Sequence, residues 1–312
     1  MKKIKIDDTE LVLSHADLHE RDWIGQEELM DQILACWLVI TPKDMPLCPR
    51  LLGKPGMGKT TLAITAAKQL GKPVYIYQCT MDTRPEDLIV TPVISEGGKI
   101  RYHASSLVTA MIQGGVAILD EANRMSEKSW ASLAPLLDNR RYVESIIAGI
   151  KIHAHPEFRC CVTMNDDAST YEVPDYIISR LQPMIQLDFP AKEEELAILK
   201  YNLNFAPNDI LQLTVDFLQR SHEAHLDYSI RDGLNIARYA MKFKGYKSKK
   251  RISWKDAFQK SVEQVLGKDA LDIKKKSARI NTRNLNNAVF LEDFFMGEKD
   301  WMEGDQEEEQ GL

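Results

Sequence analysis

The sequence has few cysteines and no long apolar run. Its five cysteines are odd in number and irregularly spaced, so buried thiols are a better interpretation than a disulfide framework. No apolar stretch approaches the roughly 20 residues needed to span a bilayer. The charged N-terminal segment has no apolar run behind it, which argues against a signal peptide. We therefore expect a cytoplasmic protein without membrane contact.

Basic residues are also fewer than acidic ones. Lysine and arginine number 40 against 46 aspartate and glutamate residues, which gives a net charge of −6. Because proteins that bind nucleic acids are more often basic overall, a nucleic-acid partner is not favoured. The exception is the basic run KFKGYKSKKR at 242–251, which could meet phosphates. A solvated loop is its simpler interpretation.

The chain is long enough for two domains, with 312 residues of which 44% are hydrophobic. Up to about residue 190, apolar segments typical of buried strands alternate with helical patterns, which predicts an α/β fold with a parallel sheet. Beyond this point, apolar residues recur only at helical spacing. We predict an α/β domain at 1–190, a small helical domain at 191–270 and a C-terminal extension with an acidic tail at 271–312.

One group of potential metal ligands is His153 and His155 with Cys160 and Cys161. The two histidines would share one face of a strand, because alternate residues of a strand point the same way. The cysteines lie in the apolar run CCV, which is typical of a buried core strand. A core position is the better interpretation, so we expect no metal site there.

The segment GKPGMGKT at 53–60 matches the pattern G-x-x-x-x-G-K-[ST] of a phosphate-binding loop, and it lies between a short strand and a helix as that loop requires. Its backbone N–H groups and the helix N-terminus favour a polyanion. We predict that this loop binds ATP, with Lys59 on the β- and γ-phosphates and Thr60 on Mg²⁺. The predicted nucleotide-binding residues of the loop are Gly53, Pro55, Gly56, Met57, Gly58, Lys59, Thr60 and Thr61.

The segment VAILDEANR carries two acids at the end of an apolar strand. The carboxyl ends of strands are where α/β sheets bind ligands. Asp120 is therefore predicted to hold Mg²⁺. Glu121 is predicted to orient and polarise the attacking water, because phosphoryl transfer depends mainly on placement and charge neutralisation. A purely structural acidic pair is the less favoured alternative.

Three further polar residues are candidates for the same chemistry, although each also has an ordinary structural explanation. Asn165 ends the strand CCVTMN and could contact the γ-phosphate or its water. Arg180 lies shortly before the last strand of the sheet and could reach the ATP of a neighbouring subunit as an arginine finger. Arg231 begins a helix of the second domain and could link that domain to the nucleotide state.

Two β-hairpins are predicted inside the α/β domain. The segment VISEGGKIRYHASSLVTAM at 93–111 predicts a hairpin followed by an amphipathic helix. A two-residue turn at Gly97–Gly98 would place Val93 opposite Tyr102. The segment RRYVESIIAGIKIHA predicts a second hairpin, with its turn near Ala148–Gly149.

Taken together, these motifs resemble the AAA+ superfamily and, within it, the MoxR group with its CbbQ- and NorQ-type relatives. The resemblance covers about residues 20–240. It rests on IGQEE, LDEANR, LLDNRRYV, TMN, HPEFR with SRLQPMIQLDFP, and SIR. It implies a P-loop AAA+ core with β-hairpin inserts, followed by an all-α lid. It places Ile24 and Gly25 beside the adenine.

The resemblance also implies roles for the three isolated residues. Asn165 matches the sensor-1 position, Arg180 the arginine finger, and Arg231 the Ser-x-Arg of sensor 2. The family's fold implies a homo-oligomer, a hexameric ring, in which ATP lies between subunits. MoxR-type proteins remodel protein clients, often with a von Willebrand factor A-domain partner. The hairpins would face the central channel, with residues 96–99 meeting the client.

Other functions remain open at this stage. TMNDD replaces the family's frequent Asn-Pro and is similar to a segment of McrB-type motors, so a nucleic-acid motor or loader using ATP or GTP is one alternative. A nucleotide-gated scaffold with little turnover is another. A small-molecule kinase ranks last, because it would need neither Arg180 at a subunit edge nor a sensor at Arg231.

Overall fold

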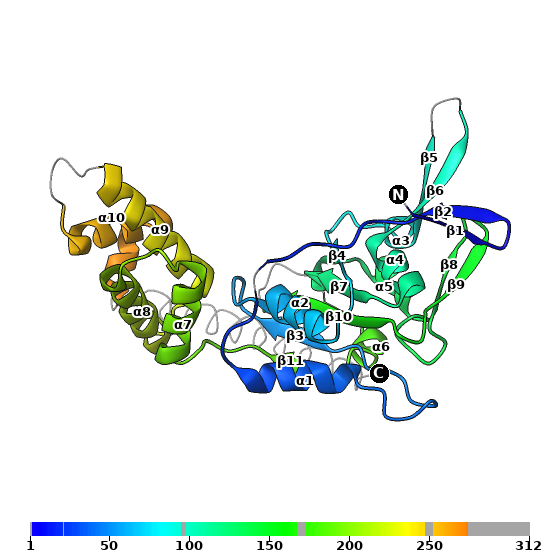
Figure 1. Ribbon diagram of the computed structural model, residues 1–312, viewed down its shortest axis with the longest axis horizontal. Helices are drawn as coiled ribbons and strands as arrows, with labels where there is room; N and C mark the ends of the chain where they lie inside the picture. Colours follow the sequence, from blue (N-terminus) through cyan, green and yellow to red (C-terminus); the bar gives the residue numbers. More distant parts are fainter. Residues whose placement is uncertain (1, 21, 95–97, 167–171, 247–251, 274–312) are drawn as a thin grey trace, which may run out of the picture. The chain divides into compact units, whose positions relative to one another are not determined.

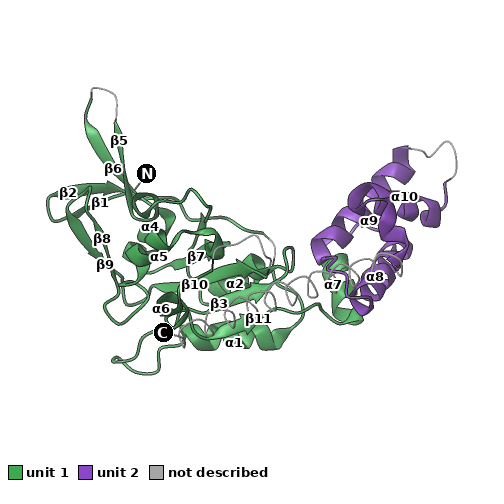
Figure 2. Cartoon of the chain, turned by 180° about the vertical axis from the view of Figure 1, so that it is seen from behind, with its two compact units in different colours: residues 1–201 green, residues 202–312 purple. Residues whose placement is uncertain are grey.

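The chain forms two compact units, Met1–Tyr201 and Asn202–Leu312, which are described separately (Figure 2). The predicted domain bounds stay a prediction. The computed structural model describes residues 2–20, 22–94, 98–166, 172–246 and 252–273.

A five-stranded parallel sheet is the centre of the first unit (Figure 1). Its strand order is β11-β3-β10-β7-β4. The predicted α/β fold is confirmed, and the strands that carry the P-loop, the acidic pair and Asn165 lie side by side in the sheet. The strands are β3 (Arg50–Gly53), β4 (Val74–Gln78), β7 (Val116–Asp120), β10 (Arg159–Asn165) and β11 (Met184–Gln186).

Alternating side chains of β7 build two separate cores on the two faces of this sheet. Val116 and Ile118 belong to the core that includes side chains of helices α1 and α2, whereas Ala117 and Leu119 belong to the core that includes those of α4 and α5. All four are fully buried, as expected for a parallel strand covered on both sides. The helices are α1 (Glu27–Trp37), α2 (Lys59–Gln69), α4 (Ser106–Gln113) and α5 (Glu127–Leu133).

The first predicted hairpin is present as β5 (Val90–Ile94) and β6 (Ile100–Ala104), but its predicted register is wrong. Tyr102 lies opposite Pro92, and Val93 lies opposite Arg101. The register is fixed at the base of the hairpin, where two buried residues, Val90 and Ala104, face each other. A slip of one residue would turn this buried pair away from the core. The turn residues 95–97 lie outside the described residues.

An N-terminal hairpin, which the sequence analysis did not predict, enlarges this one into a sheet. Strands β1 (Lys3–Ile6) and β2 (Thr9–Val12) pair antiparallel, and β2 runs parallel to β6, so the order is β1-β2-β6-β5. The second predicted hairpin is confirmed as β8 (Tyr142–Ser145) and β9 (Ile150–His153). Thr9 Oγ1 donates to Ala148 O in the turn of that hairpin, at 3.4 Å.

Two helices end earlier than the sequence pattern indicates. Apolar spacing predicts a helix over 27–40, but α1 ends at Trp37, and Leu38 has an extended backbone. A second helix is expected from about Glu127 to Leu137, but α5 ends at Leu133. Two short helices, α3 (Pro85–Leu88) and α6 (Asp175–Ile178), and the longer α7 (Lys192–Asn202) complete the first unit.

The second unit is helical in the part that the structure describes. Helices α8 (Asn208–Glu223), α9 (Ile230–Tyr246) and α10 (Trp254–Leu266) pack through apolar faces. Phe217 of α8 is the centre of an aromatic cluster, because its ring lies 5.7 Å from that of Tyr228 and 5.9 Å from that of Phe258. Such pairs add packing energy beyond the buried area.

Gly233→Ala is expected to lower the free energy of unfolding of the second unit by about 1–3 kcal/mol, as overpacked cores do. A Cβ at Gly233 would lie 2.6 Å from Leu218 Cδ1, so the buried Leu218 side chain would have to move within the packed core. Urea titration followed by circular dichroism measures this loss. Gly245→Ala in the same helix is the control, because nothing lies within 4 Å of its Cβ. An equal loss in both variants would contradict the close approach.

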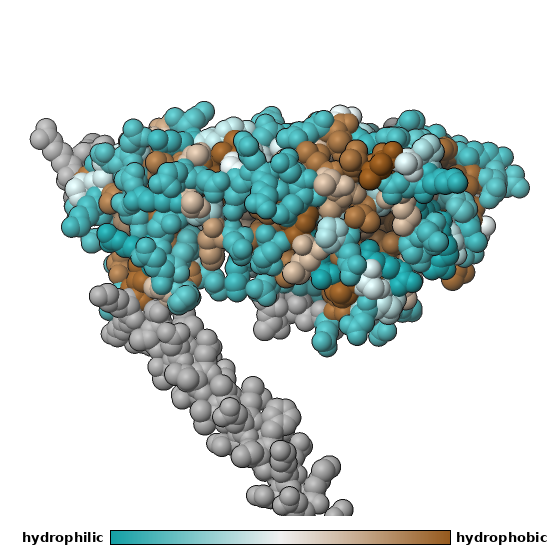
Figure 3. All heavy atoms as spheres, turned by 90° about the horizontal axis from the view of Figure 1, so that it is seen from below, coloured by the Kyte–Doolittle hydropathy of each residue, from teal (hydrophilic) through white to brown (hydrophobic). Residues whose placement is uncertain are grey.

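Apolar patches interrupt the polar surface on the side of the molecule seen from below (Figure 3). The loop after α1 contributes exposed apolar side chains to the surface: Leu38, Ile40, Met45 and Leu47. Among the residues that the structure describes, none of the helices combines the length and apolarity needed to cross a bilayer.

Candidate functional site

The predicted phosphate-binding loop joins β3 to α2 as the motif requires. Gly56 and Gly58 have φ angles of 84° and 91°, the left-handed region that only glycine adopts without strain. Gly53 is constrained in another way, because a Cβ there would lie 2.7 Å from the backbone oxygen of Leu187. The loop conformation therefore depends on glycine at three positions, of which Gly53 and Gly58 are the fixed glycines of the motif.

Lys59 begins α2 and is buried, with three oxygen acceptors around its ammonium group. Nζ donates to Gly53 O at 2.7 Å, to Lys54 O at 3.0 Å and to Asn165 Oδ1 at 2.9 Å. A buried ammonium requires such partners. The side chain of Asn165 thus meets Lys59 directly, which brings the predicted sensor next to the predicted phosphate ligand.

Thr60 and Asp120 meet at the carboxyl end of the sheet. Thr60 Oγ1 donates to Asp120 Oδ1 at 2.6 Å, and Thr163 Oγ1 donates to the same oxygen at 2.7 Å. Carboxylate and hydroxyl oxygens are the donors that Mg²⁺ prefers. Thr60 and Asp120, the two residues predicted to hold the metal ion, are therefore in contact, and both carry oxygen atoms of the kind that Mg²⁺ binds.

Glu121 has a left-handed backbone, with φ 54° and ψ 42°. Its N–H donates to Thr163 Oγ1 at 3.0 Å, so Thr163 holds both acids of the pair. The carboxylate of Glu121 forms an ion pair with Arg124, Oε2 to Nε 2.6 Å. Non-glycine residues in this backbone region are strained and cluster at functional sites.

The segment before α1 lies against the phosphate-binding loop. Trp23 N donates to Thr65 Oγ1 of α2 at 2.8 Å, and a Cβ at Gly58 would lie 3.0 Å from the Trp23 ring. Ile24 and Gly25 follow directly, and Gln26 N donates to Glu194 Oε1 of α7 at 2.9 Å. The predicted base-binding residues are thus next to the loop, and their role stays a prediction.

Arg180 has other partners than the cluster around Lys59. It forms an ion pair with Asp138, Nε to Oδ2 3.4 Å, and donates to Tyr176 O. A hydrogen bond from Arg140, assisted by Arg180, lowers the pKa of Asp138 to about 2, so Asp138 is charged at neutral pH. Arg180 is part-exposed at 30%, as a residue that reaches another molecule must be.

Arg231 belongs to the second unit, where it is exposed in the first turn of α9. Its helix begins beside Ser229, whose hydroxyl and N–H both contact Asp232 Oδ2, at 2.9 and 2.8 Å. This is a local cap of the helix start. The sensor role of Arg231 stays a prediction.

Three residues of the site were not predicted from the sequence: Thr163, Asn123 and Arg124. Asn123 Nδ2 donates to Asn165 O at 2.9 Å and so fixes the end of β10. The sequence did contain a signal for Thr163, because it is a polar residue next to the apolar run of β10. In the structure it is buried, with 1% of its surface exposed. A buried hydroxyl requires a partner, and Asp120 is that partner.

Thr163→Val is expected to lower the free energy of unfolding by about 1–3 kcal/mol, the cost of an unsatisfied buried polar group. The change removes a donor to Asp120 and an acceptor for Glu121 N. Chemical denaturation of the full chain measures it. Thr163→Ser retains the hydroxyl and is expected to keep most of the stability. A valine variant as stable as the wild type would contradict a stabilising role of the Thr163 hydroxyl.

Known proteins provide an independent comparison. The family of AAA domains of the dynein-related subfamily matches residues 50–181, the stretch from β3 to just before β11. This stretch therefore matches an AAA domain, and the chain is similar to curated proteins of the MoxR group. It is 29% identical over 153 residues to Protein CbbQ of Hydrogenophilus thermoluteolus (48% of this chain, 57% of that protein). It is 29% identical over 157 residues to Protein MoxR of Paracoccus denitrificans (50% and 45%).

A solved structure shares the AAA+ fold. It is the RuvB Holliday junction branch migration motor of Thermotoga maritima, with a TM-score of 0.53 over 77% of this chain and 69% of that chain. The sequence identity is 18%, so the likeness concerns the fold alone. The chain spans about half the length of the curated relatives it matches. The resemblance to the MoxR group and the α/β core with a helical C-terminal region are thus confirmed.

Proposed function

We propose that this AAA+ protein binds ATP with Mg²⁺ at the P-loop and hydrolyses it to ADP and phosphate. The observation that carries the proposal is the cluster of Lys59, Thr60, Asp120 and Asn165 at the carboxyl edge of the parallel sheet. A hydrogen bond joins the Lys59 ammonium to the Asn165 amide there, and another joins the two oxygens suited to a metal ion, those of Thr60 and Asp120. Phosphoryl transfer requires these groups.

Each residue of the cluster has a distinct part in the reaction. Lys59 binds the β- and γ-phosphates, and Thr60 and Asp120 hold Mg²⁺, which neutralises the charge that develops on the phosphates. Glu121 orients the attacking water, and Asn165 fixes Lys59 and the γ-phosphate relative to each other. The ion pair with Arg124 holds the Glu121 carboxylate, so Glu121 must leave Arg124 to reach the water.

We further propose a homo-oligomeric ring, a hexamer, in which Arg180 of one subunit completes the ATP site of its neighbour. Arg180 is held by Asp138 and Tyr176 rather than by the P-loop cluster of its own chain. Its partial exposure supports a role between chains. Arg231 would then report the nucleotide state to the helical unit.

The work of such a ring is remodelling of a protein client, with a von Willebrand factor A-domain protein as the partner to test first. The hairpins β5–β6 and β8–β9 supply a surface for a client, because apolar side chains are exposed near their ends. Ile94 is 77% exposed, Ile100 60% and Ile146 93%. Large apolar side chains gathered in exposed positions are typical of interaction sites.

The alternatives have less support. The basic run at 242–251 lies partly outside the described residues, and the likeness to RuvB is one of fold. A nucleotide-gated scaffold would bind ATP in the same cluster but would turn it over slowly. Slow ATP turnover would indicate the scaffold. Stimulation of ATP turnover by a nucleic acid would indicate the motor.

The test is ATPase activity as a function of subunit concentration, with GTP assayed in parallel. Turnover per subunit is expected to rise with concentration, because the site is completed by a neighbour. A pull-down with Glu121→Gln, held on ATP, then identifies the client as protein or nucleic acid. Turnover that is absent, or independent of concentration, would overturn the proposal of an interface ATPase.

A further inference from the structure

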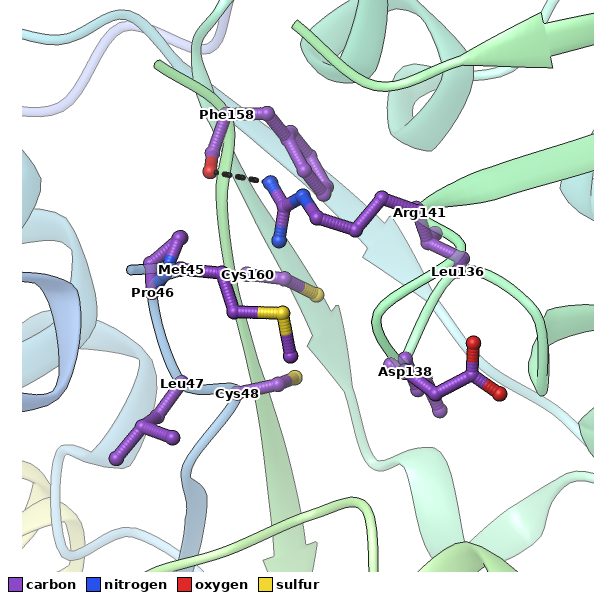
Figure 4. A pocket seen from close by; sticks show the side chains of 10 residues that line it. Met45, Pro46, Leu47, Cys48, Leu136, Asp138, Arg141, Phe158 and Cys160 are labelled. Carbon is purple, nitrogen blue, oxygen red and sulfur yellow. Dashed lines mark hydrogen bonds between the residues drawn. The ribbon is translucent and has the colours of Figure 1, made fainter. Parts of the chain in front are cut away.

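A small cavity in the first unit is lined by three sulfur-containing side chains. Its volume is about 20 Å³, roughly the room that one water molecule or one metal ion needs. Met45 and Cys48 line it from the segment before β3, and Cys160 lines it from β10 (Figure 4). Figure 4 shows Met45 and Cys160 directed toward the middle of the group, where Cys48 closes one side.

The two thiols are neighbours, one on β10 and the other on the segment that leads into β3. Strands β3 and β10 are parallel, with Arg50 opposite Val162. Just before β3 begins, Pro49 O still accepts a hydrogen bond from Val162 N at 3.0 Å, so the segment that carries Cys48 runs beside β10. The Cys48 thiol lies within hydrogen-bond reach of the Cys160 side chain. The hydrogen bond with the Cys160 side chain, together with burial, raises the pKa of the Cys48 thiol.

The cavity can be reached from solvent through Met45. This side chain is 37% exposed on the loop after α1, while Cys160 is 6% exposed. The site therefore has an outer thioether, an intermediate thiol and an inner thiol. Neither thiol forms a disulfide in the structure.

We propose that Met45, Cys48 and Cys160 form a binding site for one soft monovalent metal ion of the Cu(I) class. Thiolate and thioether sulfurs are the donors that select Cu(I). Each cysteine loses its proton on binding, so one Cu(I) displaces two protons. The inference is independent of the nucleotide site, because it uses none of the residues around Lys59.

The charge of the site favours a monovalent ion. Two thiolates with one Cu(I) carry one net negative charge, and the guanidinium of Arg141 lines the same cavity. Arg141 is held there by a 3.0 Å hydrogen bond from Nη2 to Phe158 O and by the Phe158 ring, 5.5 Å away. A buried charge requires such a counter-charge.

Zn²⁺ fits the site less well, because structural zinc takes four ligands. The cavity offers one further anionic side chain, Asp138, which is paired with Arg140 and Arg180. Across the described parts of the chain, no group of three or more His, Cys, Asp and Glu residues is arranged to hold a metal ion. The two cysteines need the thioether of Met45 as their third donor.

The experiment is Cu(I) titration of the reduced full chain without oxygen, in competition with the colorimetric chelator bicinchoninate. One Cu(I) per chain is expected to be retained. Cys48→Ala and Cys160→Ala are expected to lose it. Met45→Leu tests the third donor on a part-exposed side chain that can be changed without disturbing the fold. Loss of a group that only supports a metal ligand lowers metal affinity roughly tenfold. We therefore expect the Met45→Leu variant to bind Cu(I) at least about tenfold more weakly than the wild type.

The matched control is Cys161→Ala. Cys161 is the next residue of β10 and is fully buried, but it faces the core on the α1 and α2 side of the sheet. The Cys161→Ala variant is therefore expected to retain one Cu(I) per chain. Equal losses in the Cys160 and Cys161 variants, or no Cu(I) held by the reduced wild-type chain, would overturn the proposal. Tighter binding of Zn²⁺ than of Cu(I) would also overturn it. The same holds if the reduced chain binds no metal and Cys48 and Cys160 form a disulfide in air.

Discussion

Lys59→Ala is expected to weaken ATP binding by roughly 10- to 100-fold, since hydrogen bonds to charged groups contribute about 1.5–3 kcal/mol each. Lys59 is the buried cation of the loop, and its ammonium joins the loop to Asn165. Removing it deletes the positive charge that meets the phosphates and leaves two buried oxygens, Gly53 O and Asn165 Oδ1, without their donor. Titration with a fluorescent ATP analogue measures the affinity.

Lys54→Ala is the matched control for this prediction. Lys54 lies five residues earlier in the same loop, but its side chain forms an ion pair with Asp166 at 3.8 Å at the surface. Exposed ion pairs of this kind contribute little. Its variant is expected to bind ATP nearly as the wild type does. If both variants lost affinity equally, net loop charge rather than the placement of Lys59 would explain binding.

Glu121→Gln is expected to reduce ATP hydrolysis by roughly 10²- to 10⁴-fold while ATP binding is retained, because a positioned acid–base group contributes about that much to rate. The amide has nearly the shape of the carboxylate, so the left-handed backbone and the bond from Glu121 N to Thr163 are preserved. Single-turnover hydrolysis and nucleotide titration separate the two effects.

Glu127→Gln serves as its control. Glu127 is an exposed acid in the first turn of α5, six residues after Glu121, so the same charge is lost on the same segment. Its hydrolysis rate is expected to stay near that of the wild type. If instead Glu121→Gln hydrolysed ATP at the normal rate, another group would have to position the water.

Local sequence patterns predicted much of the first unit, and tertiary contacts account for what they did not predict. The strands of the central sheet are apolar runs, and runs of this kind are characteristic of buried parallel strands. The hairpin β1–β2 was not found: Lys3–Ile6 alternates between polar and apolar residues, but Thr9–Val12 does not, and β2 pairs with β6, which is about 90 residues away. The register of β5–β6 followed the buried pair Val90–Ala104 rather than the glycine turn.

In the candidate site too, the residues in local motifs were predicted from the sequence, and those that act through distant contacts were not. The P-loop and the acidic pair have fixed local spacing, and the structure brings Thr60 and Asp120 into contact. Thr163 and Asn123 act through contacts across strands, 43 and 42 residues from their partners Asp120 and Asn165. No local pattern encodes such a distance. The ion pair of Glu121 with Arg124 is local, but the sequence alone does not indicate which partner an acid takes.

The most direct test of the account mixes two variants that are each expected to be inactive, Arg180→Ala and Glu121→Gln. In a ring with head-to-tail interfaces, an Arg180→Ala subunit keeps its own Glu121 and receives Arg180 from a Glu121→Gln neighbour. Random mixing in equal amounts makes about one quarter of the interfaces complete. We therefore predict that the mixture regains roughly that fraction of wild-type ATPase activity. A mixture as inactive as its components would contradict a shared site.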